Sequence, residues 1–184
     1  MTVQKQLYTL QQFEQFIAQP ENRERIFELI NGEIVEKGPT EEHGIIAGLI
    51  VTEFNLYLKT HPLGRAGVEV RHRIPEDEKN DYIPDVSFIS NERALAVTKK
   101  GAVPQMPDIA VEIRSPDDST RKMREKALYY LKNGSRMAIL VFPRKQQVEV
   151  HTEESVQTYN VDDTIDLSAV LPGFSLVVKD IFAQ

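Results

Sequence analysis

The sequence "DIAVEIRSPDDSTRKMREKALYYLKNG", residues 108–134, predicts a strand followed at once by a helix. Side chains alternate along a strand, so the apolar residues of its first part share one face and Glu112 lies on the other face with Arg114. Pro116 ends the strand and Gly134 ends the helix. An acidic side chain is thus expected within a buried strand, just before a helix begins.

The rest of the chain predicts further strands and helices around this unit. Helical spacing of apolar residues indicates helices, and alternation or short apolar runs indicate strands. The expected helices are 10–19 and 43–61, the expected hairpins are 25–38 (around Asn31-Gly32) and 146–161, and the expected strands are 67–74, 82–90 and 136–142, with "LPGFSLVVKDIF" closing the chain. This order predicts a single α/β domain over 1–184, in which a mixed central sheet is flanked by helices and carries an N-terminal hairpin and a C-terminal β extension.

Composition limits the classes of function. The chain has 184 residues, a net charge of −6 and no cysteine, which excludes disulfides and thiolate metal sites. The negative charge argues against indiscriminate nucleic-acid binding but leaves room for a local basic groove. The N-terminus lacks the pattern of a signal peptide, and no apolar run has the length of a membrane span. A cytoplasmic location is therefore expected.

Two carboxylates lie in strands that otherwise look buried. Glu112 stands between Val111 and Ile113, and Asp85 lies in the apolar sequence "YIPDVSFIS". An ionised carboxylate in such surroundings is costly unless a cation or several donors meet it. Two such groups on adjacent strands could bind Mg²⁺ or Mn²⁺.

The alternative is structural. Each acid would then pair with an arginine, for which Arg71, Arg73 and Arg114 are the candidates. Arg71 and Arg73 share one face of the strand expected over 67–74, where they would neutralise the acids or contact DNA. The spacing alone does not decide between a metal site and these ion pairs.

Pro84-Asp85, followed 27 residues later by Glu112-Ile113-Arg114, resembles the PD-(D/E)XK nuclease motif. Over nearly the whole chain, the order and spacing of several segments resemble a restriction-endonuclease-like family of that superfamily, made up largely of uncharacterised bacterial proteins. The segments are "FELINGEIVEKGPTEEHGIIAGLI", "YIPDVSFIS", "PDIAVEIRSPDDSTRKMREKALYYLKNG" and "MAILVFPRKQQVEVH". The resemblance implies a restriction-endonuclease-like core, with Asp85 and Glu112 as ligands of a divalent metal.

The superfamily places a catalytic lysine two residues after the glutamate, where this chain has Arg114. Arginine stays protonated and cannot act as a general base, although it can orient a water or hold a phosphate. Lys126, on the following helix, is the substitute that the resemblance favours, because a lysine four residues before a tyrosine (here Tyr130) recurs in the family. Lys122 lies one turn earlier on the same face, and both lysines could instead form a solvated basic face.

Three upstream residues are possible accessories of the site. Glu28 and Glu33 flank the Asn-Gly turn, and related nucleases often take a further acid from this region. His43 begins the long helix, where the family pattern also has a histidine, although a lone histidine is more often structural. The resemblance thus implies a magnesium-dependent endonuclease that cuts DNA, expected to act as a homodimer. The alternative function is a weakened nuclease fold that serves as a nucleic-acid or protein binding module.

Overall fold

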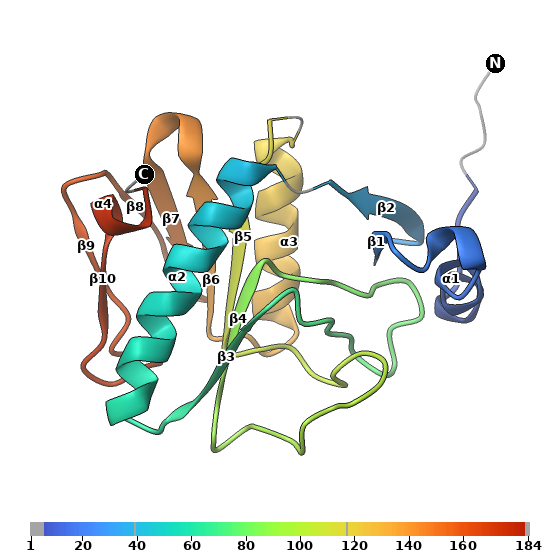
Figure 1. Ribbon diagram of the computed structural model, residues 1–184, viewed down its shortest axis with the longest axis horizontal. Coiled ribbons are helices and arrows are strands. Elements are labelled where there is room, and N and C mark those ends of the chain that lie inside the picture. The colour runs from blue at the N-terminus through green and yellow to red at the C-terminus, as the bar shows by residue number, and fades with distance from the viewer. Residues whose placement is uncertain (1–5, 39, 117, 183–184) are drawn as a thin grey trace.

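A six-stranded mixed sheet forms the centre of the structure (Figure 1). The computed structural model describes residues 6–38, 40–116 and 118–182. In spatial order the strands are β3 (Gly64–Val68), β4 (Val86–Ser90), β5 (Ile109–Ile113), β6 (Met137–Phe142), β7 (Gln147–His151) and β8 (Val156–Tyr159). Only β5 and β6 are parallel, and α3 (Thr120–Lys132) connects them. This is the helical crossover that a parallel pair requires.

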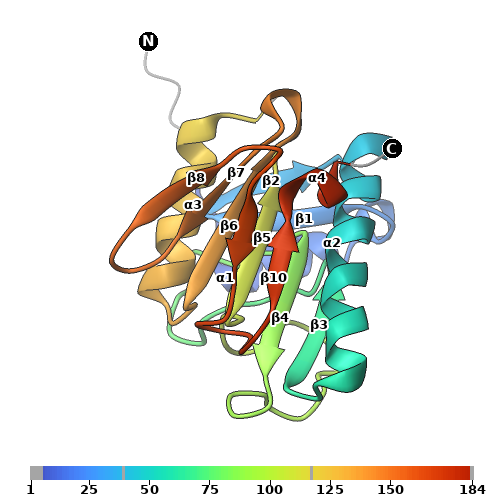
Figure 2. The ribbon, with the colours of Figure 1, turned by 90° about the vertical axis from the view of Figure 1, so that its left-hand side faces the viewer.

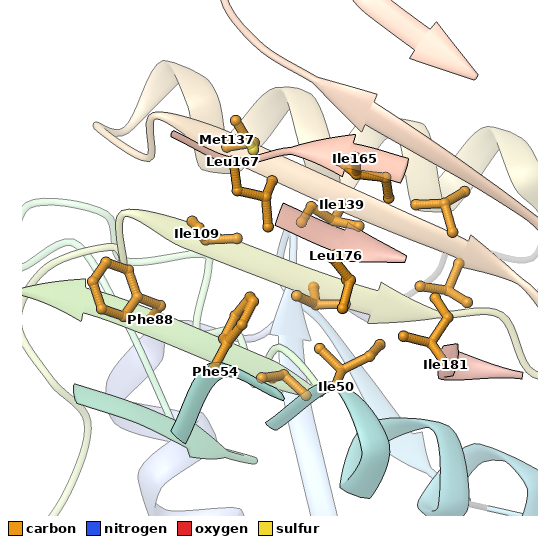
Figure 3. Packing of buried hydrophobic residues seen from close by; sticks show 14 of the residues in the cluster. Ile50, Phe54, Phe88, Ile109, Met137, Ile139, Ile165, Leu167, Leu176 and Ile181 are labelled. Carbon is orange, nitrogen blue, oxygen red and sulfur yellow. The ribbon is translucent and has the colours of Figure 1, made fainter. Parts of the chain in front are cut away.

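Different elements cover the two faces of the sheet. On one face lies α2 (Glu41–Thr60), together with β9 (Thr164–Asp166), β10 (Ser175–Val177) and the short helix α4 (Val178–Ile181) (Figure 2). Their apolar side chains interdigitate with those of the sheet, as Figure 3 shows for Phe54 against Phe88. The opposite face packs against α3, through Ala127 and Tyr130. Among the described residues, no helix is long and apolar enough to cross a membrane.

An N-terminal hairpin projects beside the sheet (Figure 1). It consists of β1 (Ile26–Ile30) and β2 (Glu33–Lys37), and α1 (Leu10–Ile17) packs against it. Asn31 and Gly32 have φ angles of 51° and 82°, as the predicted Asn-Gly turn requires. Leu29 pairs with Asp81 through backbone hydrogen bonds in both directions, which attaches the hairpin to the segment that leads into β4.

The predicted fold class is confirmed, but two predicted strands begin and end elsewhere. The strand expected over 67–74 overlaps β3 (Gly64–Val68) at only two residues, because β3 ends at Val68, where Glu69 adopts a left-handed φ of 50°, and residues 69–74 form no strand. The strand expected over 82–90 begins only at Val86. Pro84 lacks an amide hydrogen and cannot take a full part in a ladder. Asp85 therefore lies at the point where β4 begins.

Candidate active site

Asp85 and Glu112 meet where β4 begins and β5 ends. The antiparallel register pairs Val86 with Val111, and continuing it by one residue sets Asp85 opposite Glu112. Two backbone hydrogen-bond donors reinforce this arrangement: the Asp85 amide donates to Val111 O over 2.9 Å, and the Ile113 amide donates to Asp85 Oδ2 over 2.6 Å. Both carboxylates are buried, and like charges directly across a sheet destabilise it. The pair therefore needs cationic or hydrogen-bonding partners.

Asp85 has three such partners. Besides the Ile113 amide, Lys37 Nζ lies 2.5 Å from Asp85 Oδ1, and His43 Nε2 lies 2.9 Å from Asp85 Oδ2. Burial alone would raise the pKa of Asp85, but the hydrogen bond from His43 and the charge of Lys37 outweigh it and hold this pKa near 2. In return, the hydrogen bond with Asp85 and the Asp85 charge together outweigh burial and raise the pKa of His43. Asp85 is therefore ionised at neutral pH.

Glu112 is in a different electrostatic state. Its carboxylate accepts hydrogen bonds from Tyr130 Oη over 2.5 Å and from Lys126 Nζ over 3.1 Å. Burial is the strongest influence and raises the pKa of Glu112 to about 7, although Lys126 opposes this change. The neighbouring charges of Asp85 and Glu28 also act to raise it. Glu112 can therefore gain or lose a proton near neutral pH, unlike Asp85.

Lys126 joins the N-terminal hairpin to the sheet. Its ammonium lies 2.7 Å from Glu28 Oε2 as well as 3.1 Å from Glu112, so two buried carboxylates share it. Glu28 Oε1 accepts a further hydrogen bond from the Ile83 amide over 2.8 Å. Burial would lower the pKa of Lys126, but the charges of Glu112 and Glu28 outweigh it and raise this pKa. Lys126 is therefore a permanent cation and hydrogen-bond donor.

Five residues singled out from the sequence thus lie in one connected cluster: Glu28, His43, Asp85, Glu112 and Lys126. They come from β1, α2, the start of β4, β5 and α3. The fold thus brings together side chains from five separate elements of the chain.

Other singled-out residues lie outside this cluster. Glu33 and Lys122 line a separate open hollow beside the hairpin. Arg114 Nε donates to Asp118 O over 3.1 Å. Arg71 and Arg73 both bind Glu14, and Arg71 also binds Asp81, so the alternative that arginines neutralise Asp85 and Glu112 is wrong.

The sequence interpretation missed Lys37, and it treated Tyr130 only as a feature that accompanies Lys126. Lys37 also donates to Ile83 O over 2.7 Å, so it is held between the hairpin and the start of β4. Its position follows from the hairpin register, in which Lys37 pairs with Ile26 and shares a face with Glu28. The predicted hairpin register could therefore have placed Lys37 on the face of Glu28, although it gives no sign that this face meets Asp85. Tyr130 lies one helical turn after Lys126, on the same buried face of α3.

The donor set fits a hard divalent cation in its chemistry. The carboxylate oxygens of Asp85 and Glu112 are the ligands that Mg²⁺ and Mn²⁺ prefer. Among the residues that the structure describes, no three His, Cys, Asp or Glu side chains stand ready around one ion. Mg²⁺ commonly binds through one or two carboxylates and takes its remaining ligands from water and phosphate. Asp85 and Glu112 would hold such an ion.

Comparisons with known proteins place this site in a family. One solved structure, described as "a putative nuclease belonging to DUF820" from Anabaena variabilis ATCC 29413, matches with a TM-score of 0.80 and 26% identity, over 95% of this chain and 97% of that one. A DrdV–DNA complex matches with a TM-score of only 0.38 and 14% identity, over 74% of this chain and 14% of that one, a likeness that carries no argument. No curated protein matches the chain. Residues 10–179 match the family Uma2, described as "Putative restriction endonuclease", and the chain belongs to that family.

Proposed function

We propose that this protein is a magnesium-dependent endonuclease that hydrolyses phosphodiester bonds in DNA. The observation that carries the proposal is the opposition of Asp85 and Glu112 across β4 and β5, with Lys126 bonded to Glu112. Membership of the family and the nuclease-like solved structure support a nuclease as the general class. The metal is inferred from the chemistry of the buried carboxylates, and DNA is inferred as the substrate from the likeness to restriction endonucleases.

Each side chain has a role that its surroundings favour. A magnesium ion held by Asp85 and Glu112 would polarise a phosphate oxygen and lower the pKa of a bound water. Lys126 keeps its proton, so it serves as a donor that orients the attacking water and stabilises the charge developing on the phosphate.

The remaining groups hold these side chains in place. His43 and the Ile113 amide orient the Asp85 carboxylate, and Tyr130 orients that of Glu112. Glu28 positions Lys126 from the hairpin, as a neighbour of the site and not as a ligand of the metal. In this proposal Lys126, Asp85 and Glu112 act on water, metal or phosphate, and the other groups hold them in place.

A second candidate function rests on Lys37. Its ammonium lies 2.5 Å from Asp85, and Lys126 already bonds to Glu112, so both carboxylates have cationic partners without a metal. A nuclease fold that has become a nucleic-acid or protein binding module would tolerate this arrangement permanently. In an active enzyme, a divalent ion must compete with Lys37 for Asp85.

Nicking of supercoiled plasmid in Mg²⁺ or Mn²⁺ distinguishes the two functions. We expect the wild type to nick the plasmid, and we expect Asp85→Asn and Glu112→Gln to lose this activity. Glu125→Gln, an exposed acid-to-amide change on α3, should behave as the wild type. Equal nicking by all four proteins would refute the assigned residues. DNA binding without nicking by the folded wild type would favour the binding module.

The homodimer is also a proposal. Two active sites would allow both strands of a duplex to be cut, and closed symmetric dimers are the commonest oligomers. Sedimentation of the wild type with and without a DNA duplex tests it. A chain that stays monomeric in both conditions would leave single-strand nicking as the expected reaction.

A further inference from the structure

A basic pocket lies next to the candidate active site. Arg114, just after β5, forms one wall of the pocket. The end of β6 and the residues after it, Phe142 to Lys145, form another wall, and Glu42 lies on the α2 side. Arg144 and Lys145 belong to a short 3₁₀ helix, Pro143–Lys145, that turns the chain from β6 into β7. Three positive side chains and one negative side chain leave the pocket with a net positive charge, although the whole chain carries −6.

The pocket and the active site share two structural elements. Arg114 follows Glu112 by two residues, and its amide donates to Val141 O, which continues the β5–β6 pairing beyond the strand end. Glu42 directly precedes His43, which binds Asp85. The pocket therefore lies at the same end of β5 as Glu112, where the backbone of a polymer bound at Asp85 and Glu112 can reach it.

The cationic groups of the pocket are not committed to ion pairs. Arg114 gives one hydrogen bond, from Nε to a backbone oxygen, which leaves its two terminal nitrogens available. In the part of the chain that the structure describes, neither Arg144 nor Lys145 has a side-chain hydrogen bond or an ion pair, and both side chains are exposed. By contrast, Arg71 and Arg124 each bind a carboxylate through two nitrogens.

We propose that this pocket binds a backbone phosphate of the nucleic acid adjacent to the phosphate that is cleaved. The inference rests on the proposed function, because a neighbouring phosphate exists only if the substrate is a polynucleotide. Arginine and lysine neutralise phosphates and fix the register of a nucleic acid without reading its bases. Arg114 is then a residue that positions the substrate, and Lys126 alone occupies the role of the superfamily lysine.

Binding, measured apart from cleavage, tests the pocket. In a Glu112→Gln background, which we expect not to cleave, the affinity for a short fluorescein-labelled DNA duplex is followed by fluorescence anisotropy over a series of salt concentrations. The double variant Arg144→Gln/Lys145→Gln should weaken binding. It should also make the slope of log K against log[salt] less steep, by about 0.9 for each phosphate that the protein no longer neutralises. Lys59→Gln/Lys132→Gln removes the same charge from the C-terminal ends of α2 and α3 and should leave that slope unchanged.

The outcomes separate this inference from the proposed function. Equal reductions of affinity and slope in the two double variants would overturn the pocket, because overall charge would then explain the effect. If the parent protein, Glu112→Gln, does not bind the duplex, the proposed phosphate pocket is overturned as well. Pocket-dependent binding by a wild type that does not nick plasmid would support the pocket and refute the enzyme. The double variant Arg144→Lys/Lys145→Arg keeps both charges and should bind the duplex as the parent protein does. This control shows whether loss of the fold, and not loss of charge, explains the weaker binding of the Gln variants.

Discussion

The two ends of strand β5 each carry a buried acid, but the two acids have very different partners. At the beginning, Asp108 binds Arg93 Nη1 over 2.8 Å and accepts the Ser90 amide over 2.7 Å. At the other end, Glu112 shares Lys126 with Glu28 and faces Asp85. Asp108 pairs with one arginine, Arg93. At the Glu112 end, by contrast, Asp85, Glu112 and Glu28 pair with only two lysines, Lys37 and Lys126.

This difference separates an acid that holds the fold together from acids that can take part in chemistry. Arginine presents a planar fork of donors that suits a carboxylate, and Arg93 gives Asp108 one dedicated partner. Lysine is a compact point charge on a flexible stem and can shift between neighbours. At the Glu112 end, burial and, to a smaller extent, the neighbouring acids raise the pKa of Glu112 to about 7. Functional sites often contain such a perturbed pKa beside a charged partner, which is why we assign the chemistry to this end of the strand.

The largest effect is expected from Lys126→Met. Removing this donor should lower the rate of DNA cleavage about 10³-fold, equivalent to about 4 kcal/mol in the activation barrier. Arg114→Met should instead raise KM and leave kcat within a few-fold of the wild type. Steady-state cleavage kinetics of the two variants check this. A larger loss of kcat in Arg114→Met than in Lys126→Met would reverse the roles of the two residues.

Asp108→Ala should affect stability and leave chemistry intact. It leaves Arg93 without its carboxylate and the Ser90 amide without its acceptor. Because the Arg93 side chain is partly exposed, the loss should lie at the low end of the range for a broken buried pair, about 3 kcal/mol. Urea unfolding measures this loss, and the cleavage rate of the folded fraction should match the wild type. A specific loss of cleavage in a stably folded variant would contradict the comparison.

Glu112 should make stability depend on pH. Its folded-state pKa near 7 exceeds the unfolded value of 4.5, so its protonated form favours the fold. That contribution is fully present below pH 4.5 and is lost as the pH rises through 7. As the pH rises from 4.5 to 8, the free energy of unfolding of Glu112→Gln should therefore increase relative to that of the wild type by up to about 3 kcal/mol. Urea unfolding of both proteins in EDTA measures the difference, and parallel stability curves across this range would contradict the raised pKa.

The smallest effect is expected for a surface pair. Arg121 and Glu125 form an ion pair one turn apart on α3, with both side chains well exposed. Arg121→Gln should change the free energy of unfolding by less than about 0.5 kcal/mol and leave cleavage unchanged. Thermal unfolding in low and high salt tests this expectation. A loss of several kcal/mol would show that exposure is a poor guide to the role of a charged pair in this protein.

The fold could be predicted because local patterns and tertiary structure agree. The Asn-Gly turn, the helix after Pro116 and the apolar run of β6 each have one favourable local structure. The end of β3 could not be predicted in the same way. Glu69 takes a left-handed conformation that its residue type does not favour, so tertiary packing decides it.

The candidate site was only partly predictable for a similar reason. Asp85 and Glu112 stand out because charge in an apolar strand is costly, so their sequence context shows them. Lys37, by contrast, is a surface-type residue in sequence, and only the approach of the hairpin brings it within 2.5 Å of Asp85. Such a contact between distant segments leaves no local pattern, because its two strands do not follow one another in the chain.

The most direct test of the account is Mn²⁺ binding followed by electron paramagnetic resonance. We predict that the wild type binds Mn²⁺ in a saturable way, that Asp85→Asn and Glu112→Gln each abolish this binding, and that Glu125→Gln retains it. Binding that is equal in all four folded proteins would place the metal elsewhere. A folded wild type that binds no Mn²⁺ at millimolar concentration would contradict the claim that the Glu112 end of β5 is an active site.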